Sequence, residues 1–228
     1  MKKPIFKIKN LSFDKNELKI LNIKKFEIHR SACYLFNGNM ASGKTLLLDI
    51  LTKNNSNYKG MIDFEGRSLK KVQKSKYKSE IMYVRQHFNA PYFKTVKSYI
   101  YSHVNKNGYK KNTDKIISDI VKVMDFKYII DSKMRHLTPS QLRWVNLAAK
   151  IAAFPKVLFI DEIELHLNMA KIKSLCKILY RKVNYDGITI IATTQNKEFF
   201  DSLSSVSINI NHGRITSVRS KPKYNKKK

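Results

Sequence analysis

One stretch of eight residues constrains the fold of this chain more than any other. Residues 38–45 read G-N-M-A-S-G-K-T. The apolar residues 32–36 precede this stretch and the apolar residues 46–51 follow it. A strand, a glycine-rich turn and a helix in this order form a loop whose backbone N–H groups surround a phosphate at the helix N-terminus. The sequence therefore predicts a phosphate-binding loop, with a nucleoside triphosphate as its ligand.

Two side chains of this loop have separate expected roles. Lys44 supplies a positive charge to the β- and γ-phosphates, and Thr45 supplies a hydroxyl ligand to Mg²⁺. We expect the whole loop to contribute to nucleotide binding through Gly38, Asn39, Met40, Ala41, Ser42, Gly43, Lys44 and Thr45.

Two adjacent carboxylates give the second functional signal. Residues 157–160 are a run of four apolar residues, and Asp161 and Glu162 follow them directly. A buried strand would bring Asp161 to the edge of a sheet beside the phosphate loop, where it can hold Mg²⁺. Glu162 is then placed to polarise an attacking water as a general base. The alternative is that both are ordinary carboxylates at the end of a strand.

Short apolar strands and helical stretches alternate along the chain. Strands are expected at residues 5–8, 20–28, 32–36, 60–66, 81–86, 157–160 and 188–192, and helical patterns at residues 46–51, 96–147, 145–153 and 170–183. A basic loop is expected between the fourth and fifth of these strands. The alternation predicts an α/β fold with a mainly parallel sheet covered on both faces.

Taken together and in order, these motifs resemble those of an ABC-type ATPase, the nucleotide-binding subunit of ABC transporters, over almost the whole chain. Phe13 matches the aromatic residue that stacks on adenine, and Gln86 matches the glutamine that contacts Mg²⁺ and links the two lobes. Residues 137–141 read L-T-P-S-Q where the family signature reads L-S-G-G-Q. The resemblance implies that Thr138, Ser140 and Gln141 contact a nucleotide held by a second subunit.

The resemblance also implies an architecture. The expected fold is a P-loop NTPase core with a mainly parallel sheet, an N-terminal antiparallel β subdomain and an inserted helical subdomain. Residues 1–220 would form a single domain, with a core lobe at 1–87 and 154–220 and a helical lobe at 88–153. The basic tail, residues 221–228, is expected to be disordered.

The chain departs from the family pattern around the γ-phosphate. Pro139 replaces a signature glycine and removes an N–H donor, and Ser140 replaces the next glycine. No histidine stands at the position of the family's switch histidine, where Thr194 is expected to act, or Gln195 if the alignment slips by one residue. We therefore expect Glu162, Gln86 and Thr194 to form a catalytic set that binds ATP with Mg²⁺ and hydrolyses it slowly.

The chain is strongly basic, with 45 Lys and Arg against 17 Asp and Glu and a net charge of +28. One basic cluster comprises Arg67, Lys70, Lys71, Lys74, Lys76 and Lys78. A solvated, compositionally biased surface is one interpretation of this charge. The other is binding to an anionic partner, either lipid headgroups or nucleic acid.

These observations leave three functional hypotheses open. The first is an energy-coupling ATPase that pairs with a second ABC ATPase subunit, identical or different, and with a separate integral membrane subunit. No apolar run reaches the length of a membrane span and no secretion signal is recognised, so we expect a cytoplasmic protein peripheral to the inner membrane face. The second is a soluble ABC-type ATPase acting on nucleic acid or ribosomes. The third is a non-catalytic ATP-binding scaffold in an assembly complex.

Overall fold

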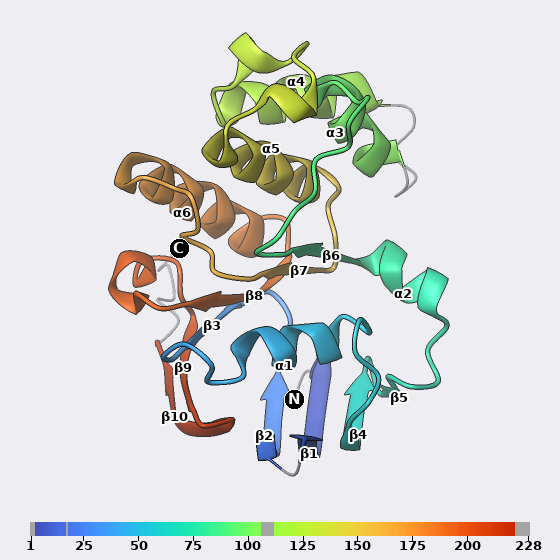
Figure 1. The fold of residues 1–228 in the computed structure, drawn as a ribbon, viewed down its shortest axis with the longest axis vertical. Coiled ribbons are helices and arrows are strands. Elements are labelled where there is room, and N and C mark those ends of the chain that lie inside the picture. The colour runs from blue at the N-terminus through green and yellow to red at the C-terminus, as the bar shows by residue number, and fades with distance from the viewer. Residues whose placement is uncertain (1–2, 17, 106–111, 222–228) are drawn as a thin grey trace, which may run out of the picture.

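The computed structural model in Figure 1 describes residues 3–16, 18–105 and 112–221. Its N-terminal part contains a four-stranded antiparallel sheet in the order β2-β1-β4-β5. The strands are β1 (Phe6–Lys15), β2 (Leu18–Ile28), β4 (Lys59–Phe64) and β5 (Arg67–Ser68). The expectation of an N-terminal antiparallel subdomain agrees with this arrangement.

A six-stranded sheet forms the centre of the molecule, in the order β10-β9-β3-β8-β7-β6. Its strands are β3 (Cys33–Asn37), β6 (Ile81–Val84), β7 (Val157–Ile160), β8 (Thr189–Thr194), β9 (Val206–Asn211) and β10 (Arg214–Ser220). All neighbouring strands are parallel except β9 and β10, which form an antiparallel hairpin. The predicted α/β fold with a mainly parallel sheet is therefore confirmed.

The sequence of β7 shows why this sheet is covered on both faces. All four of its side chains are fully buried. Val157 and Phe159 pack into the core that contains α1 (Lys44–Leu51) and the antiparallel sheet. Leu158 and Ile160 point the other way, into the core that contains the later helices. This alternation is the reason that a continuous apolar run forms a central parallel strand.

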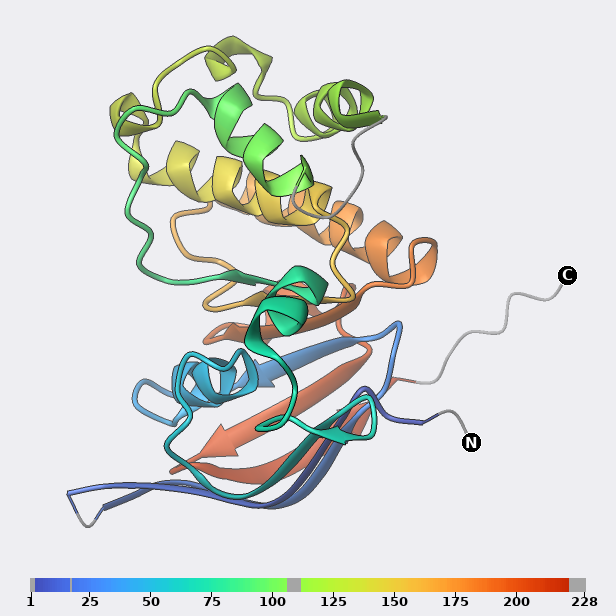
Figure 2. The same cartoon turned by 90° about the vertical axis from the view of Figure 1, so that its right-hand side faces the viewer.

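The helices on the second side of the main sheet, opposite the antiparallel sheet, form two layers, the outer layer stacked on the inner one (Figure 2). They are α3 (Val96–Val104), α4 (Thr113–Val123), α5 (Pro139–Ala152) and α6 (Met169–Asn184), with short 3₁₀ turns η3 (Lys127–Ile129), η4 (Met134–His136) and η5 (Lys197–Phe200). The buried side chains of these helices and of the sheet form one continuous core. Within it the Trp144 indole donates to the Met124 carbonyl at 2.7 Å.

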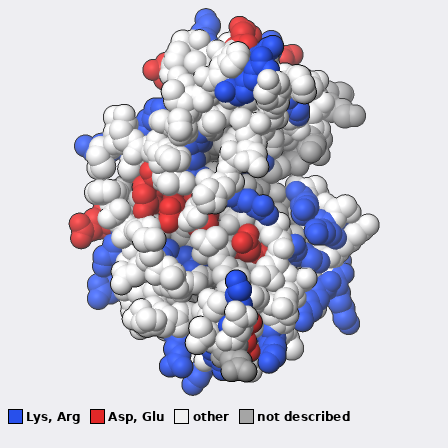
Figure 3. Space-filling view, in the orientation of Figure 1, with Lys and Arg blue, Asp and Glu red and all other residues white. Residues whose placement is uncertain are grey.

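The segment that we expected to be a basic loop is partly ordered, and this expectation was wrong. It contains β5 and the helix α2 (Lys74–Glu80). Tyr77 anchors this helix, because its ring is fully buried and its hydroxyl donates to the Leu51 carbonyl at 2.5 Å. A helix with a single buried residue shows no apolar periodicity, so the sequence pattern could not reveal it. Its lysines are exposed, and Lys and Arg side chains gather around α2 in Figure 3.

The C-terminal end is described only as far as Lys221, whose N–H donates to the Ser205 carbonyl at 2.9 Å. The rest of the tail that we expected to be disordered lies outside the described residues. No helix in the described ranges combines the length and the apolar character that crossing a membrane requires.

Candidate functional site

The phosphate loop connects β3 to α1, as expected from its sequence. Ala41 and Gly43 have positive φ angles of 58° and 93°, which curve the backbone before the helix begins. The Lys44 ammonium lies inside this curve, where it donates to the carbonyls of Gly38 at 2.5 Å and Asn39 at 2.7 Å. It also contacts the Ser42 hydroxyl at 3.1 Å. A positive charge therefore sits at the centre of the loop.

Neighbouring strands hold this loop closely from two sides. The Gly213 N–H in the β9–β10 turn donates to the Ser42 carbonyl at 3.1 Å. A Cβ on Gly38 would lie 2.2 Å from the Ile210 carbonyl oxygen, so only glycine fits there. A Cβ on Gly43 would lie 2.8 Å from a methyl group of Leu21 in β2. The β9–β10 hairpin was not among the expected strands, although the glycine after His212 is a turn signal.

Phe13 reaches the neighbourhood of the loop through its strand. It is the cross-strand partner of Leu21, the residue that packs against Gly43. The Phe13 side chain is partly buried, and the register of β1 and β2 shifts just after it. This placement is compatible with the expected contact between Phe13 and adenine, which stays a prediction.

Asp161 lies directly after β7 and is only 1% exposed. Its Oδ1 atom accepts a hydrogen bond from the Thr193 hydroxyl at 2.6 Å. Burial raises the pKa of Asp161, with smaller contributions from the charges of Glu162 and Asp49, while the hydroxyls of Thr193 and nearby Thr45 lower it. Among the described residues no donor reaches Asp161 Oδ2 with hydrogen-bond geometry, and this oxygen is buried.

The orphaned oxygen of Asp161 tests whether the site fits Mg²⁺. A buried carboxylate oxygen without a donor is unfavourable unless a cation or another donor completes it. The nearby Thr45 hydroxyl is exposed and lies close enough to influence the pKa of Asp161. Carboxylate and hydroxyl oxygens are the hard ligands that Mg²⁺ prefers, so the donor set fits this ion.

Glu162 follows Asp161 in a left-handed conformation with φ of 45°. Its N–H donates to the Thr193 hydroxyl at 2.8 Å, and its Oε1 atom accepts from Gln195 Nε2 at 2.9 Å. Burial lowers the pKa of Lys44, while the negative charges of Glu162, Asp161 and Glu164 raise it. The carboxylates after β7 therefore lie within electrostatic reach of the phosphate-loop lysine.

The two residues considered for the switch position lie differently. Thr194 is fully buried, and its hydroxyl donates to Glu164 Oε1 at 2.9 Å. Gln195 is exposed and directs its side-chain amide at Glu162. Of these two residues, Gln195, the alternative in the sequence alignment, is thus the one whose side chain contacts Glu162.

A buried arginine that sequence reasoning missed links three segments of the site. Arg143 of α5 is 4% exposed and donates to the backbone carbonyls of Arg85, Asp161 and Glu162 at 2.7, 2.7 and 2.8 Å. Burial lowers its pKa to about 10, so the guanidinium stays charged at neutral pH. Gln86 follows Arg85 beyond the end of β6 and is partly buried, next to the strand that carries Asp161. The position of Arg143 carried no signal, because an arginine in a helix is usually a surface residue.

The signature residues form the N-terminus of α5. The Thr138 hydroxyl accepts from the Gln141 N–H at 3.3 Å, and Gln141 Oε1 accepts from the Thr138 N–H at 3.0 Å, which is a capping box. Pro139 occupies the first turn, where the N–H that proline lacks would have no partner within the helix. Ser140 accepts from Lys171 of α6 at 3.3 Å. The proline therefore favours formation of the helix, independently of its effect on nucleotide binding.

The chain is similar to known proteins in sequence and in fold. Residues 21–164 match the family model described as ABC transporter. The zinc import ATP-binding protein ZnuC of Ehrlichia chaffeensis is 25% identical over 209 residues, which cover 91% of this chain and 80% of that protein. A putative ABC transporter ATP-binding protein of Clostridium tetani is 24% identical, and the chain spans about half (49%) of its length.

Solved structures show the same fold. An ATP-binding subunit of an ABC transporter superposes with a TM-score of 0.86 at 15% identity, over 95% of this chain and 90% of that one. CbiO1 of Clostridium perfringens, part of the CbiONQ transporter complex, gives a TM-score of 0.80 at 20% identity, over 96% and 89%. The resemblance stated from the sequence motifs is confirmed, and the chain belongs to the ABC transporter family as an ATP-binding ATPase subunit.

Proposed function

We propose that this chain couples ATP binding, and slow ATP hydrolysis, to a separate membrane subunit of a transporter. One observation carries the proposal. The phosphate-loop lysine, Lys44, and the two carboxylates after β7, Asp161 and Glu162, lie within electrostatic reach of one another in the folded chain. A triphosphate binds in such a loop with its γ-phosphate near the carboxylates.

The ion that accompanies ATP would be held by Asp161 and Thr45, with Gln86 as a third ligand. Bound Mg²⁺ would neutralise the charge that develops on the β- and γ-phosphate oxygens. The support for this assignment is the buried Asp161 Oδ2 atom, which no donor among the described residues satisfies.

Glu162 would act as the general base toward water. It directly follows Asp161, and among the described residues its carboxylate accepts a hydrogen bond from Gln195. The resemblance assigns the switch position to Thr194, or to Gln195 with a shift of one residue, and the contact of Gln195 with Glu162 supports Gln195. An amide can orient Glu162 and donate to an oxyanion, but it carries no positive charge. We therefore expect turnover lower by a factor on the order of 10²–10³ than with a full set of charged donors.

The second subunit would complete the site from the other side. We propose a head-to-tail dimer in which Thr138, Ser140 and Gln141 face the partner's ATP. A helix N-terminus of this kind is a favourable place for a phosphate, since the helix dipole favours negative charge there. In this chain the capping box already uses Thr138 and Gln141, so the contact would be weaker than with a glycine signature.

An exposed aromatic pair supports docking of a membrane subunit at the inner membrane face. Tyr92 is 59% exposed and Phe93 is 85% exposed, and their rings lie 4.9 Å apart. The Arg135 guanidinium stacks over Tyr92 at 4.3 Å. Neighbouring aromatic residues with such exposure are typical of interaction sites.

Co-purification and turnover test this proposal together. We expect an integral membrane protein to co-purify with the wild-type chain, and the double substitution Tyr92→Ala and Phe93→Ala to lose it without changing ATP binding. We also expect slow turnover that Glu162→Gln abolishes. Vigorous basal turnover would contradict the slow hydrolysis, and its complete absence would favour the non-catalytic scaffold.

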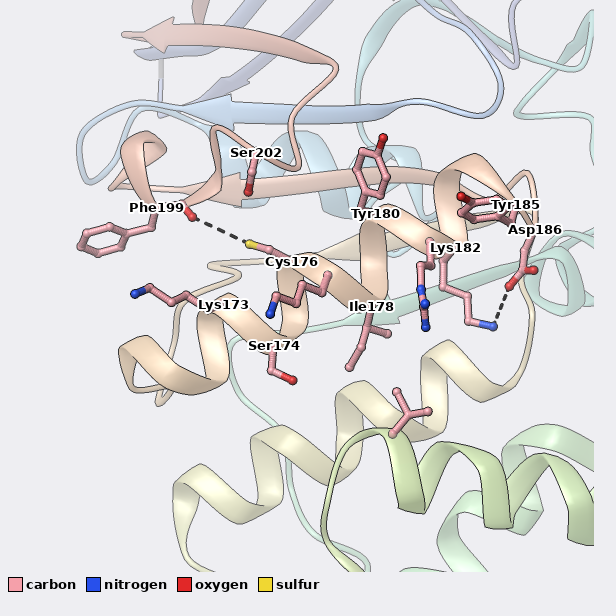
Figure 4. Close-up of a pocket in the computed structure, with 13 residues that line it drawn as sticks. Lys173, Ser174, Cys176, Ile178, Tyr180, Lys182, Tyr185, Asp186, Phe199 and Ser202 are labelled. Carbon is pink, nitrogen blue, oxygen red and sulfur yellow. Dashed lines mark hydrogen bonds and ion pairs between the residues drawn. The ribbon is translucent and has the colours of Figure 1, made fainter. Parts of the chain in front are cut away.

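One observation favours a second function, an ATPase that acts on nucleic acid or ribosomes. A surface hollow of ≈ 1230 Å³ runs along α6 away from the phosphate loop. Lys173, Lys177 and Arg181 are exposed there at four-residue spacing, on one face of the helix. Tyr180 and Tyr185 line the same hollow (Figure 4), and they are 50% and 72% exposed.

Cations and aromatic rings on one surface suit a single-stranded nucleic acid, which they bind by charge and by stacking. This function predicts nucleic acid retained at low salt and released at high salt, with no membrane partner. Alanine at Lys173, Lys177 and Arg181 together would abolish the retention, whereas alanine at Arg67, Lys70 and Lys71 would leave it. If both triple variants retained nucleic acid equally, the binding would depend on the overall positive charge and not on a defined surface.

A further inference from the structure

Glu164 binds the segment that contains the switch position at two points. We call residues 193–196 the switch segment. Glu164 Oε1 accepts from the Thr194 hydroxyl at 2.9 Å and from the Gln195 N–H at 2.8 Å. The Thr194 hydroxyl in turn accepts from the Asn196 N–H at 3.0 Å. One carboxylate oxygen therefore fixes three consecutive residues of this segment.

The same segment contacts Glu162 on its other side. The Thr193 hydroxyl accepts from the Glu162 N–H, and the Thr193 carbonyl accepts from the Ile163 N–H at 3.0 Å. The Gln195 side chain then reaches Glu162 Oε1 at 2.9 Å. The backbone of Gln195 is thus held by Glu164, while the side chain of Gln195 reaches Glu162.

The burial of Glu164 indicates that this arrangement is specific. Its Oε2 atom is buried and has no hydrogen-bond partner among the described residues. A partly buried carboxylate with one unsatisfied oxygen is unfavourable for folding unless the other contacts compensate it. An apolar residue at this position would avoid that penalty, but it could not accept from both Thr194 and Gln195.

We propose that Glu164 is a positioning residue, which holds the switch segment so that the Gln195 amide orients the Glu162 carboxylate. It acts through Gln195 and does not touch the nucleotide itself. The Gln195 side chain rotates about several bonds. The Gln195 backbone must therefore be fixed for the amide to point at Glu162. This inference rests on the proposed ATPase activity of Glu162.

Four single variants, one of them Gln195→Ala, and one double variant test the inference through ATP turnover. For comparison, loss of an outer contact to a metal ligand typically lowers activity about 10–100-fold. Glu164→Ala should lower kcat by about tenfold and leave KM for ATP unchanged, because no nucleotide contact is lost. Glu164→Gln keeps an oxygen that accepts both hydrogen bonds and should retain most of the activity. Glu198→Ala, which removes an exposed carboxylate on η5, should leave kcat unchanged.

The double variant separates action through Gln195 from a general structural effect. If Glu164 acts through Gln195, Glu164→Ala and Gln195→Ala together should lower kcat no further than the more damaging single change. Losses that multiply would overturn the inference, as would full activity of Glu164→Ala in an active wild-type background. Equal damage from Glu164→Gln and Glu164→Ala would also overturn it.

Amide hydrogen exchange provides a readout that does not depend on turnover. The Gln195 and Asn196 N–H groups depend on Glu164 directly or through Thr194. In Glu164→Ala their exchange should accelerate, while exchange in the core strand β7 should stay as in the wild type. Unchanged exchange in the switch segment contradicts the inference even if the protein proves inactive. If the wild type shows no turnover but exchange accelerates in Glu164→Ala, only the proposed ATPase activity is contradicted.

Discussion

Gly213 and Ser42 join the β9–β10 turn to the phosphate loop through one backbone hydrogen bond of 3.1 Å. Gly213 itself has a positive φ of 70°, and a Cβ at this position would lie 1.9 Å from the Ile20 carbonyl oxygen. The turn thus fits between β2 and the loop with no room for a side chain. The conformation of the nucleotide site depends in this way on the last two strands of the fold.

Substitution of this glycine should damage both stability and nucleotide binding. Gly213→Ala should lower the free energy of unfolding by roughly 3 kcal/mol, because the new methyl group displaces backbone and the φ angle is strained. Gly66→Ala is the matched control: Gly66 has φ of 80° but nothing within 4 Å of its would-be Cβ, so about 1 kcal/mol is expected. Urea unfolding and ATP titration measure both effects. Equal losses in the two variants would show that the contact with β2 is unimportant.

Arg143 is expected to hold the signature helix against the site. Arg143→Ala should lower the free energy of unfolding by roughly 3 kcal/mol, since three backbone carbonyl groups, that of Asp161 in a buried hydrogen bond, lose this donor. Arg143→Lys should lie between the alanine variant and the wild type, because an ammonium lacks the planar fork that reaches several carbonyls. Arg219→Ala, on the exposed end of β10, is the control and should change little. A neutral effect of Arg143→Ala in urea unfolding would argue against this role.

The raised pKa of Asp161 predicts how stability depends on pH. Because burial makes the folded pKa higher than the unfolded one, protonation of Asp161 stabilises the nucleotide-free protein, and this stability is lost as pH rises through the folded pKa. Asp161→Asn mimics the neutral group. It should be at least as stable as the wild type at about pH 8, with the advantage fading toward about pH 4, where the wild-type carboxyl is itself protonated.

Urea unfolding without nucleotide at both pH values checks this prediction. The same variant should lose the stabilisation that Mg²⁺ and ATP give the wild type, because the cation needs the ionised carboxylate. An asparagine variant that is much less stable at about pH 8 than at about pH 4, relative to the wild type, would contradict the sign of the shift.

The altered signature makes a separate prediction. The double substitution Pro139→Gly and Ser140→Gly restores the glycines that the resemblance implies and should raise turnover. It should also lower helix stability by about 1 kcal/mol, because proline at the first helical turn is preorganised and glycine is not. Steady-state turnover and thermal unfolding measure the two changes. Unchanged turnover would indicate that the capping box, and not the missing glycines, sets the geometry.

The fold was predictable where the sequence carries periodic apolar patterns. The strand before the phosphate loop and β7 were both expected, since central parallel strands are continuous apolar runs. The hairpin β9–β10 was missed in part because β10 is the edge strand of the sheet. The burial along β10 alternates between partly buried and exposed residues, so its pattern is weak. The lobe boundaries at residues 88 and 153 stay a prediction, because one core cluster crosses them.

The site was predictable as far as its motifs, but its internal contacts were not. Lys44, Asp161 and Glu162 stand in recognisable patterns. Arg143 and Glu164 resemble surface residues in the sequence, and only the tertiary structure shows that they bond to other segments of the site. The choice between Thr194 and Gln195 also needed the structure, because a shift of one residue along a strand reverses the direction of a side chain.

Binding of a fluorescent ATP analogue in the presence of Mg²⁺ tests the central claim most directly. The wild-type chain should bind it in a saturable manner. Lys44→Ala should bind it at least about 100-fold more weakly, because the charge at the centre of the loop is lost. Lys71→Ala, in the exposed basic cluster, should bind as the wild type does. An affinity of the Lys44→Ala variant equal to that of the wild type would contradict the assignment of residues 38–45 as the nucleotide site.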